Sequence, residues 1–149
     1  MILVGFRHGL RVSELVSLEW NQIDLQTGTM AVSRLKNGLS TTHPLTGSEL
    51  RALRRLRRET GGSRHVFLSQ RNAPMTRQNV NVLLAELGLQ AGIEVPVHPH
   101  MLRHSTGYKL ANEGRDTRSL QHYLGHRSIE HTVRYSELAA DRFAGLWSD

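Results

Sequence analysis

The sequence predicts a mainly α-helical α+β domain with a small antiparallel three-stranded β-sheet, and two patterns carry this prediction. Through most of the chain, apolar residues recur every three or four positions, as they do along the buried face of a helix. Residues 23–45 instead alternate between polar and apolar side chains, and their Thr-Gly and Asn-Gly pairs are typical of hairpin turns. With 149 residues, the chain is long enough for one domain with its own hydrophobic core.

Each expected element has a local cause. Gly9 interrupts an apolar N-terminal helix, the capping box Thr46-Gly-Ser-Glu49 opens a helix, and Thr76 can cap the next one. Pro99 suits the first turn of a helix, and Gly125 is expected to end one. The expected helices are 2–8, 10–18, 46–58, 76–91, 99–113, 116–124, 128–134 and 139–147, and the expected strands are 23–25, 29–35, 41–45 and a short one at 66–68.

Residues 98–135 concentrate groups suited to phosphate chemistry. They hold six of the nine histidines, five arginines and one lysine against three acidic residues, and they end on Tyr135. A phosphodiester is broken either by metal ions held on carboxylates or by a covalent nucleophile within a cradle of cations. Because paired carboxylates are lacking, covalent attack is favoured. No metal site is expected, since His98 and His100 would lie on different faces of a helix and the chain has no cysteine.

The charge balance favours a polyanionic partner. Lys and Arg number 19 against 13 Asp and Glu, which gives a formal net charge of +6, and all basic residues except Lys36 and Lys109 are arginines. Arginine can bind a phosphate through two parallel hydrogen bonds. The residues expected to contact DNA are Arg34, Arg77, Gln78, Asn79 and Arg127. For residues 77–79 the alternative is ordinary polar capping of a helix.

The composition also bears on location. No apolar run approaches the ~18 residues that cross a membrane, and the N-terminus does not resemble a secretory signal. The absence of cysteine fits a reducing compartment. A cytoplasmic protein without a membrane or small-molecule partner is therefore expected.

Several motifs occur with a shared order and spacing. They are Arg11 in GLRVSEL, Lys36 in RLKNG, His100 and Arg103 in HPHMLRH, His126 in YLGH and Tyr135 in VRY. Together they resemble the tyrosine recombinases of the phage integrase family, and the resemblance extends over nearly the whole chain. The sequences of two longer segments, RLKNGLSTTHPL and YLGHRSIEHTVRY, are similar to those of the fimbrial-switch recombinases, which invert a promoter segment.

The resemblance implies a tyrosine recombinase catalytic-domain fold and cutting of DNA strands without a cofactor. The implied roles are Tyr135 as the nucleophile that forms a 3′-phosphotyrosyl bond, Arg11 and Arg103 as phosphate ligands, His100 as proton acceptor or phosphate ligand, His126 as hydrogen-bond donor to the phosphate, and Lys36 as the acid that protonates the leaving 5′-oxygen. Lysine suits that last role because, unlike arginine, it can give up its proton.

The resemblance also implies partners and boundaries. Double-stranded DNA is the expected substrate, bound by four copies of the chain, and residues 138–147 are a candidate contact with a neighbouring copy. Residues 1–149 are expected to form one catalytic domain, without the separate N-terminal DNA-clamping domain of most family members. Because the chain begins abruptly in an apolar helix without a cap, we expect upstream residues to be missing.

Two alternatives to a recombinase stay open on the sequence. Residues 117–134 can be interpreted as two short helices around a glycine turn, as in a non-catalytic helix-turn-helix module that binds DNA. Such a module would not need Arg11, Lys36 and Tyr135 together at distant positions. A type IB topoisomerase-like enzyme that relaxes DNA would share the same chemistry, but the small size and the finer motifs favour a recombinase.

Overall fold

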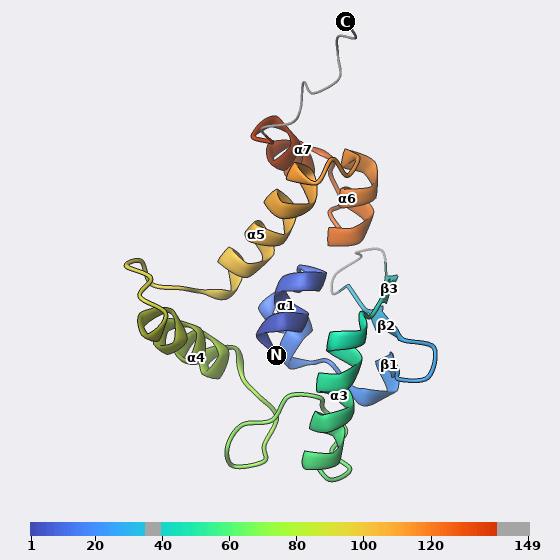
Figure 1. The fold of residues 1–149 in the computed structure, drawn as a ribbon, viewed down its shortest axis with the longest axis vertical. Coiled ribbons are helices and arrows are strands. Elements are labelled where there is room, and N and C mark those ends of the chain that lie inside the picture. Colours follow the sequence, from blue (N-terminus) through green and yellow to red (C-terminus); the bar gives the residue numbers. More distant parts are fainter. Residues whose placement is uncertain (35–39, 140–149) are drawn as a thin grey trace, which may run out of the picture.

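The computed structural model describes residues 1–34 and 40–139 (Figure 1). In these ranges the elements are, in order, α1 (Ile2–His8), α2 (Val12–Val16), the 3-10 helix η1 (Trp20–Gln22), β1 (Ile23–Asp24), β2 (Thr29–Val32), β3 (Thr41–Pro44), α3 (Gly47–Glu59), α4 (Arg77–Gln90), α5 (Pro99–Asn112), α6 (Thr117–Leu124) and α7 (Glu130–Glu137). The strands pair antiparallel in the order β1-β2-β3, so the expected fold class is confirmed.

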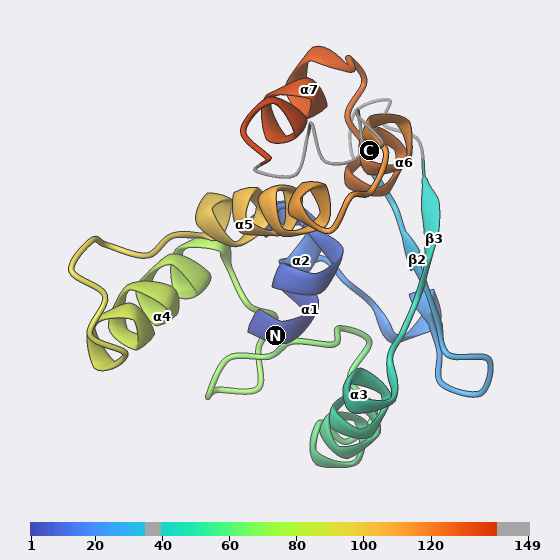
Figure 2. The same cartoon turned by 45° about the horizontal axis from the view of Figure 1, so that its top comes forward.

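Helix α1 lies at the centre of the molecule in both views (Figures 1 and 2). The sheet and α3 lie on one side of it and α4 on the other, while α5 passes over α1 and leads to α6 and α7. A hydrogen bond from the Thr106 hydroxyl to the carbonyl of Phe6 ties α5 to α1. Helices from the two halves of the chain are therefore packed together, which brings motifs from both halves to one region.

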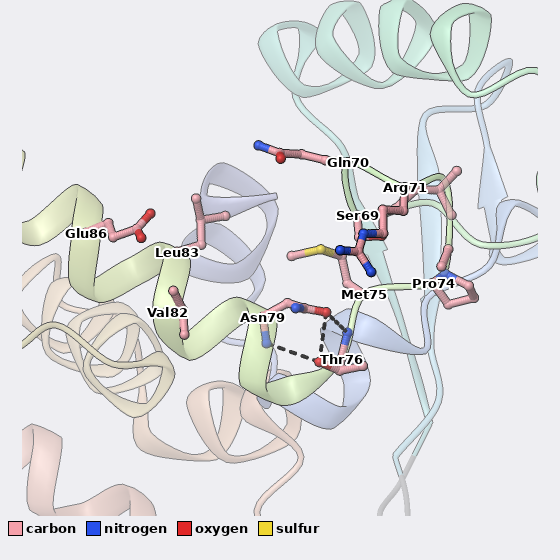
Figure 3. A pocket seen from close by; sticks show the side chains of 12 residues that line it. Ser69, Gln70, Arg71, Pro74, Met75, Thr76, Asn79, Val82, Leu83 and Glu86 are labelled. Atoms are coloured by element: carbon pink, nitrogen blue, oxygen red, sulfur yellow. Dashed lines mark hydrogen bonds between the residues drawn. The ribbon is translucent and has the colours of Figure 1, made fainter.

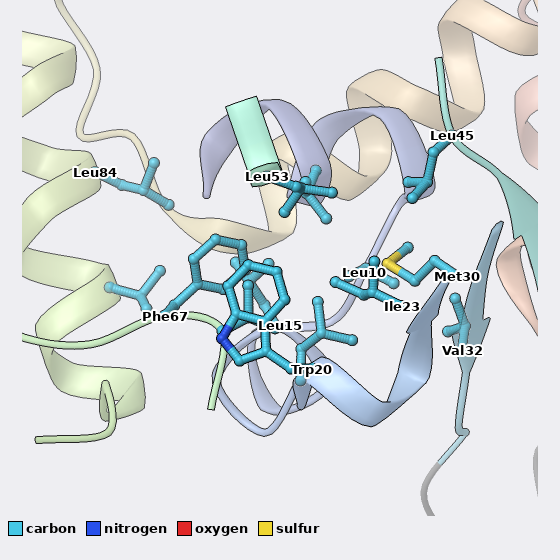
Figure 4. Packing of buried hydrophobic residues seen from close by; sticks show 14 residues of the cluster. Leu10, Leu15, Trp20, Ile23, Met30, Val32, Leu45, Leu53, Phe67 and Leu84 are labelled. Atoms are coloured by element: carbon cyan, nitrogen blue, oxygen red, sulfur yellow. The ribbon is translucent and has the colours of Figure 1, made fainter. Parts of the chain in front are cut away.

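Two hydrophobic clusters hold the fold together. The larger one combines side chains from α1, α2, the sheet, α3 and α4, and Met30, Val66 and Val80 in it have no exposed surface (Figure 4). Burial of such a side chain contributes roughly 1.5–3 kcal/mol to stability. The smaller one, the Tyr135 cluster, joins α5, α6 and α7 through Ala111, Leu120, Leu124 and Tyr135. The expected nucleophile is therefore also a core residue.

The helix ends follow the local chemistry of the sequence. Gly9 ends α1 with φ 56° and Gly125 ends α6 with φ 66°, a left-handed conformation that glycine adopts without strain. The capping box at the start of α3 is confirmed, and so is Thr76 as the cap of α4, where its hydroxyl accepts from the backbone N–H of Asn79. No helix within the described ranges is long and apolar enough to cross a membrane.

Other expected boundaries are wrong. The helix expected at 10–18 is limited to α2, because Arg11 has an extended backbone with ψ 153° and forms the N-cap. The short strand expected at 66–68 is absent. His65, just before it, and Leu68, its last residue, form only isolated bridges, to Glu19 and to Pro74.

Tyr135 lies within α7, whereas the sequence predicted a helix that ends just before it. Residues 35–39, with Lys36 and the Asn-Gly turn, and most of the helix expected at 139–147 lie outside the described residues.

Candidate active site

A cavity of about 310 Å³ lies where the start of α2, α5 and the α6–α7 region meet. Among the described residues, those that line it carry positive or titratable groups and no carboxylate. They are Arg11, His100, Arg103, His104, His126, Arg127, His131, Arg134 and Tyr135. Of the residues predicted to be catalytic, all but Lys36 thus share one cavity. Its arginines and histidines make it suited to an anion the size of a phosphate group.

Arg11 enters the cavity from the junction between α1 and α2. Its Nη1 contacts Glu14 Oε1 at 2.9 Å, and its backbone N–H donates to Glu14 Oε2 at 2.8 Å. The Arg11 side chain is 40% exposed, whereas that of Glu14 is 2% exposed. Glu14 therefore fixes one edge of the guanidinium and leaves other N–H groups free for a ligand.

Arg103 is buried beneath the cavity on α5. One terminal nitrogen donates to the carbonyl of Gly9, and the other donates to the carbonyl of Leu124 at 2.7 Å. Burial, together with the positive charges of Arg11 and Arg34, lowers the pKa of Arg103 to about 10. The guanidinium therefore stays charged at neutral pH, and it joins the ends of α1 and α6 to α5.

His126 follows the glycine that ends α6, and its Nδ1 lies 2.8 Å from the hydroxyl of Thr132. Burial lowers the pKa of His126 to about 4, and the charges of Arg103 and Arg11 act in the same direction. The imidazole is therefore neutral at physiological pH. A neutral ring has one donor and one acceptor nitrogen, and the contact with Thr132 occupies one of them.

Tyr135 lies on the inner face of α7 and is 2% exposed. Its hydroxyl lies 2.9 Å from Nδ1 of His104, and its ring packs edge-on against Tyr108 at 5.0 Å. Gly107 makes room for the ring, because a Cβ there would lie 2.6 Å from it. Burial raises the pKa of Tyr135, while the charge of Arg103 opposes the rise.

Three cavity residues were not among the predicted site residues: His104, His131 and Arg134. His104 follows Arg103 directly and lies one helical turn after His100, and Arg134 precedes Tyr135, so their places in the motifs could have indicated them. His104 makes a hydrogen bond beside the site. In the structure this hydrogen bond is made to the expected nucleophile itself.

The residues expected to contact DNA have different surroundings. Arg127 is exposed at the cavity, and Arg77 and Gln78 are exposed on the first turn of α4. The Asn79 side chain instead caps that helix, with Oδ1 accepting from the backbone N–H and the hydroxyl of Thr76 (Figure 3).

Arg34 departs most from expectation. Its side chain is 0% exposed and is paired with Glu14, so the arrangement offers no free cation to DNA.

A larger pocket of about 680 Å³ lies between residues 68–76 and α4 (Figure 3). Its lining includes apolar Met75, Val82 and Leu83 and none of the motif residues. Because it holds no candidate nucleophile near a cluster of cations, we assign the active site to the smaller cavity. The described residues contain no group of three His, Asp or Glu side chains arranged to hold a metal ion.

Comparison with known proteins identifies the family. The phage integrase family matches residues 1–142. Type 1 fimbriae regulatory protein FimE of Escherichia coli K12 is 46% identical over 153 residues, which covers 99% of this chain and 77% of that protein. Tyrosine recombinase XerC of Xanthomonas campestris pv. campestris strain B100 is 33% identical over 144 residues, which covers 95% of this chain and 44% of that protein.

The fold is similar to the crystal structure of XerA recombinase, with a TM-score of 0.82 and 27% identity over 94% of this chain. The chain spans about half of that solved chain, 53% of its length. Fold and motifs together define a tyrosine-type site-specific recombinase with the catalytic-domain fold of that class. The chain belongs to the phage integrase family. The interpretation of residues 117–134 as an independent helix-turn-helix module is not supported, because α6 and α7 are parts of this larger fold.

Proposed function

We propose that Tyr135 cuts DNA by attack of its oxygen on a backbone phosphorus, which forms a 3′-phosphotyrosyl bond and breaks the bond to the 5′-oxygen. The observation that carries this proposal is one cavity shared by Tyr135, Arg11, Arg103 and His126. Attack by a 5′-hydroxyl on the phosphotyrosine then rebuilds the phosphodiester and frees the tyrosine. Because one phosphoester bond replaces another, rejoining consumes no ATP.

Arg11 and Arg103 are proposed to bind the non-bridging oxygens, on which charge builds in the transition state. A guanidinium has five N–H groups, so each arginine keeps donors beyond those used in its contacts with Glu14, Gly9 or Leu124. These intramolecular contacts hold the donors in place before DNA arrives, which favours catalysis. Loss of either side chain should slow cleavage by ~10²–10³-fold.

Two imidazoles are proposed to handle hydrogen bonds and the tyrosine proton. With the Thr132 hydroxyl donating to Nδ1, neutral His126 carries its proton on Nε2, the form that can donate to a phosphate oxygen. Burial lowers the pKa of His104, so its ring is neutral and can accept the proton of Tyr135. His100, which the motif assigned to this step, lines the same cavity. Lys36 remains the proposed acid for the leaving 5′-oxygen.

The first prediction tests the nucleophile with a DNA duplex nicked close to the cleavage site, so that the short leaving strand diffuses away. The duplex would carry candidate inverted repeats from beside the gene, and the buffer would contain EDTA. We expect wild type to give a covalent protein–DNA adduct and Tyr135→Phe to give none, because phenylalanine lacks the attacking oxygen. Adducts would be measured on denaturing gels.

Tyr108→Phe is the matched control, since its ring packs directly against that of Tyr135. It should retain adduct formation. An adduct from Tyr135→Phe at the wild-type rate would refute the proposal. DNA that is retarded by wild type on native gels without any covalent adduct would favour binding without cleavage.

We further propose that the natural reaction is inversion of a DNA segment that carries a promoter, in a complex of four copies in the bacterial cytoplasm. Support for inversion comes from the 46% identity with a fimbriae regulatory protein. Residues 138–147 are the proposed contact between copies. Leu138 supports this, because it is a large apolar side chain that is 67% exposed at the end of the described chain.

A further inference from the structure

Glu14 holds two arginines that have different access to the cavity. Its Oε1 contacts Nη1 of Arg11 at 2.9 Å, and its Oε2 contacts Nη1 of Arg34 at 2.6 Å. The Arg11 side chain is 40% exposed and lines the cavity, whereas the side chains of Arg34 and Glu14 are 0% and 2% exposed. Arg34 therefore touches no ligand in the cavity directly, but it shares a carboxylate with a residue that can.

The other terminal nitrogen of Arg34 reaches α6. Nη2 donates to the carbonyl of Tyr123 at 2.6 Å, and Arg103 donates to the carbonyl of the next residue, Leu124, at 2.7 Å. Two arginines thus bind consecutive carbonyl groups at the C-terminal end of α6, where the helix dipole favours positive charge. Two residues further along the chain is His126, which lines the cavity.

The charges around Glu14 determine how strongly the positive charge of Arg11 can attract a phosphate in the cavity. A buried carboxylate that faced Arg11 alone would neutralise that guanidinium and draw its N–H groups away from a phosphate. With Arg34 on its second oxygen, the carboxylate is shared, and the three groups together keep a net charge of +1. The attraction between such charges is strong at this separation, because little water screens them.

We propose that Arg34 is a positioning residue for DNA cleavage. It balances the charge of Glu14, so that Arg11 stays available to the phosphate. It also holds the end of α6, which leads to His126. The inference rests on the function proposed above. It assigns Arg34 a role within the protein, in place of the DNA contact that its type and sequence position had indicated. It also gives a reason for a buried arginine at a position two residues before Lys36.

The test compares Arg34→Gln, Arg34→Lys and the double variant Arg34→Gln/Glu14→Gln in the nicked-duplex assay. Cleavage would be followed in a single turnover at saturating DNA, and DNA affinity would be measured separately. For Arg34→Gln we expect cleavage slower by ~10²-fold, as for loss of an oxyanion donor, with DNA affinity unchanged within about threefold. Arg34→Lys keeps the charge and should stay within about tenfold of wild type.

The double variant separates the charge effect from a loss of packing. Removal of both charges relieves Arg11 of an unbalanced carboxylate, so the double variant should cleave at least about tenfold faster than Arg34→Gln. Arg54→Gln is the matched control, because Arg54 donates to a backbone carbonyl, that of Leu25, at 2.7 Å on the exposed side of α3. It should cleave at the wild-type rate.

Several outcomes would overturn the inference: unchanged cleavage by folded Arg34→Gln, a loss of DNA affinity as large as the loss of rate, or no recovery in the double variant. If Arg34→Gln does not fold, Arg34→Lys is the deciding variant. A cleavage rate ~10²-fold below wild type in Arg34→Lys would count against the charge role. Absence of an adduct with wild type would instead refute the proposed function, so the two failures are distinguishable.

Discussion

Gly125 shows how one residue can serve both the backbone and the active site. Its φ of 66° lies in the left-handed region, where a side chain costs about 1–2 kcal/mol. A Cβ at this position would also lie 2.5 Å from Nε and 2.9 Å from Cδ of Arg34. Nε of Arg34 has no hydrogen-bond partner among the described residues and is buried. The stem of Arg34 therefore runs close against the backbone that precedes His126.

We expect Gly125→Ala to destabilise the protein more than Gly114→Ala. Both glycines have positive φ, but a Cβ at Gly114 would meet no atom within 4 Å, so that variant bears only the backbone cost. Displacement of Arg34 should add roughly 1–3 kcal/mol at Gly125. Urea unfolding of the two variants measures the difference. Equal losses of stability would show that Arg34 moves aside without cost.

At the scale of elements, a buried polar network joins α1, β3, α3 and α6. His8 lies between Glu49, whose Oε1 is 2.9 Å from Nε2, and His43, whose Nδ1 is 3.0 Å from Nδ1 of His8. The ring of Tyr123 stacks on His43 with centroids 4.0 Å apart, and its hydroxyl donates to the carbonyl of Arg7 at 2.9 Å. The network connects the helix that positions His126 to the sheet and to the centre of the molecule.

This network predicts acid sensitivity. Burial, with contributions from His8 and Arg34, lowers the pKa of His43 to about 3, whereas the pKa of a histidine in the unfolded chain is about 6.5. Between these values the unfolded chain binds a proton that the folded chain does not. Stability is therefore full above about pH 6.5 and falls as the pH drops toward 3, by at most about 1.4 kcal/mol per pH unit for this histidine.

Urea unfolding between pH 7 and pH 4 measures the effect of His43→Gln, which should have a shallower loss of stability than wild type. His122→Gln is the matched control, since His122 is exposed on α6, and it should follow the wild-type slope. The same slope in wild type and His43→Gln would show that His43 does not stay neutral in the folded protein.

At the scale of the whole molecule, the features that could be predicted depend on residues close in sequence. The ends of α1 and α6 follow from Gly9 and Gly125, and the start of α4 follows from Thr76. The buried state of Arg34 depends on contacts 20 and 89 residues away, and the contact between His104 and Tyr135 spans 31 residues. Such pairings are set by how the helices pack, which local patterns do not encode.

The proposal that α4 contacts DNA gives a prediction at this scale. Arg77 is exposed on the first turn of α4 and does not line the cavity, and arginine is a side chain that can bind base edges in the major groove. We expect Arg77→Ala to lower the preference for the cognate repeat over a scrambled duplex by ~1–3 kcal/mol. Competition binding at a fixed salt concentration measures this preference. Arg71→Ala removes an exposed arginine outside the helix and should leave the preference unchanged.

Tyr135 is at once the proposed nucleophile and a member of a four-residue cluster, with its ring seated over Gly107. At 2% exposure, the ring has to give up part of this packing before its oxygen can meet a phosphorus. Access of the Tyr135 oxygen to a phosphate and the packing that stabilises α7 against α5 therefore depend on the same side chain. In this structure the side chain of the proposed nucleophile is almost fully buried, so a movement of α7 away from α5 would expose it and would also remove packing from the Tyr135 cluster.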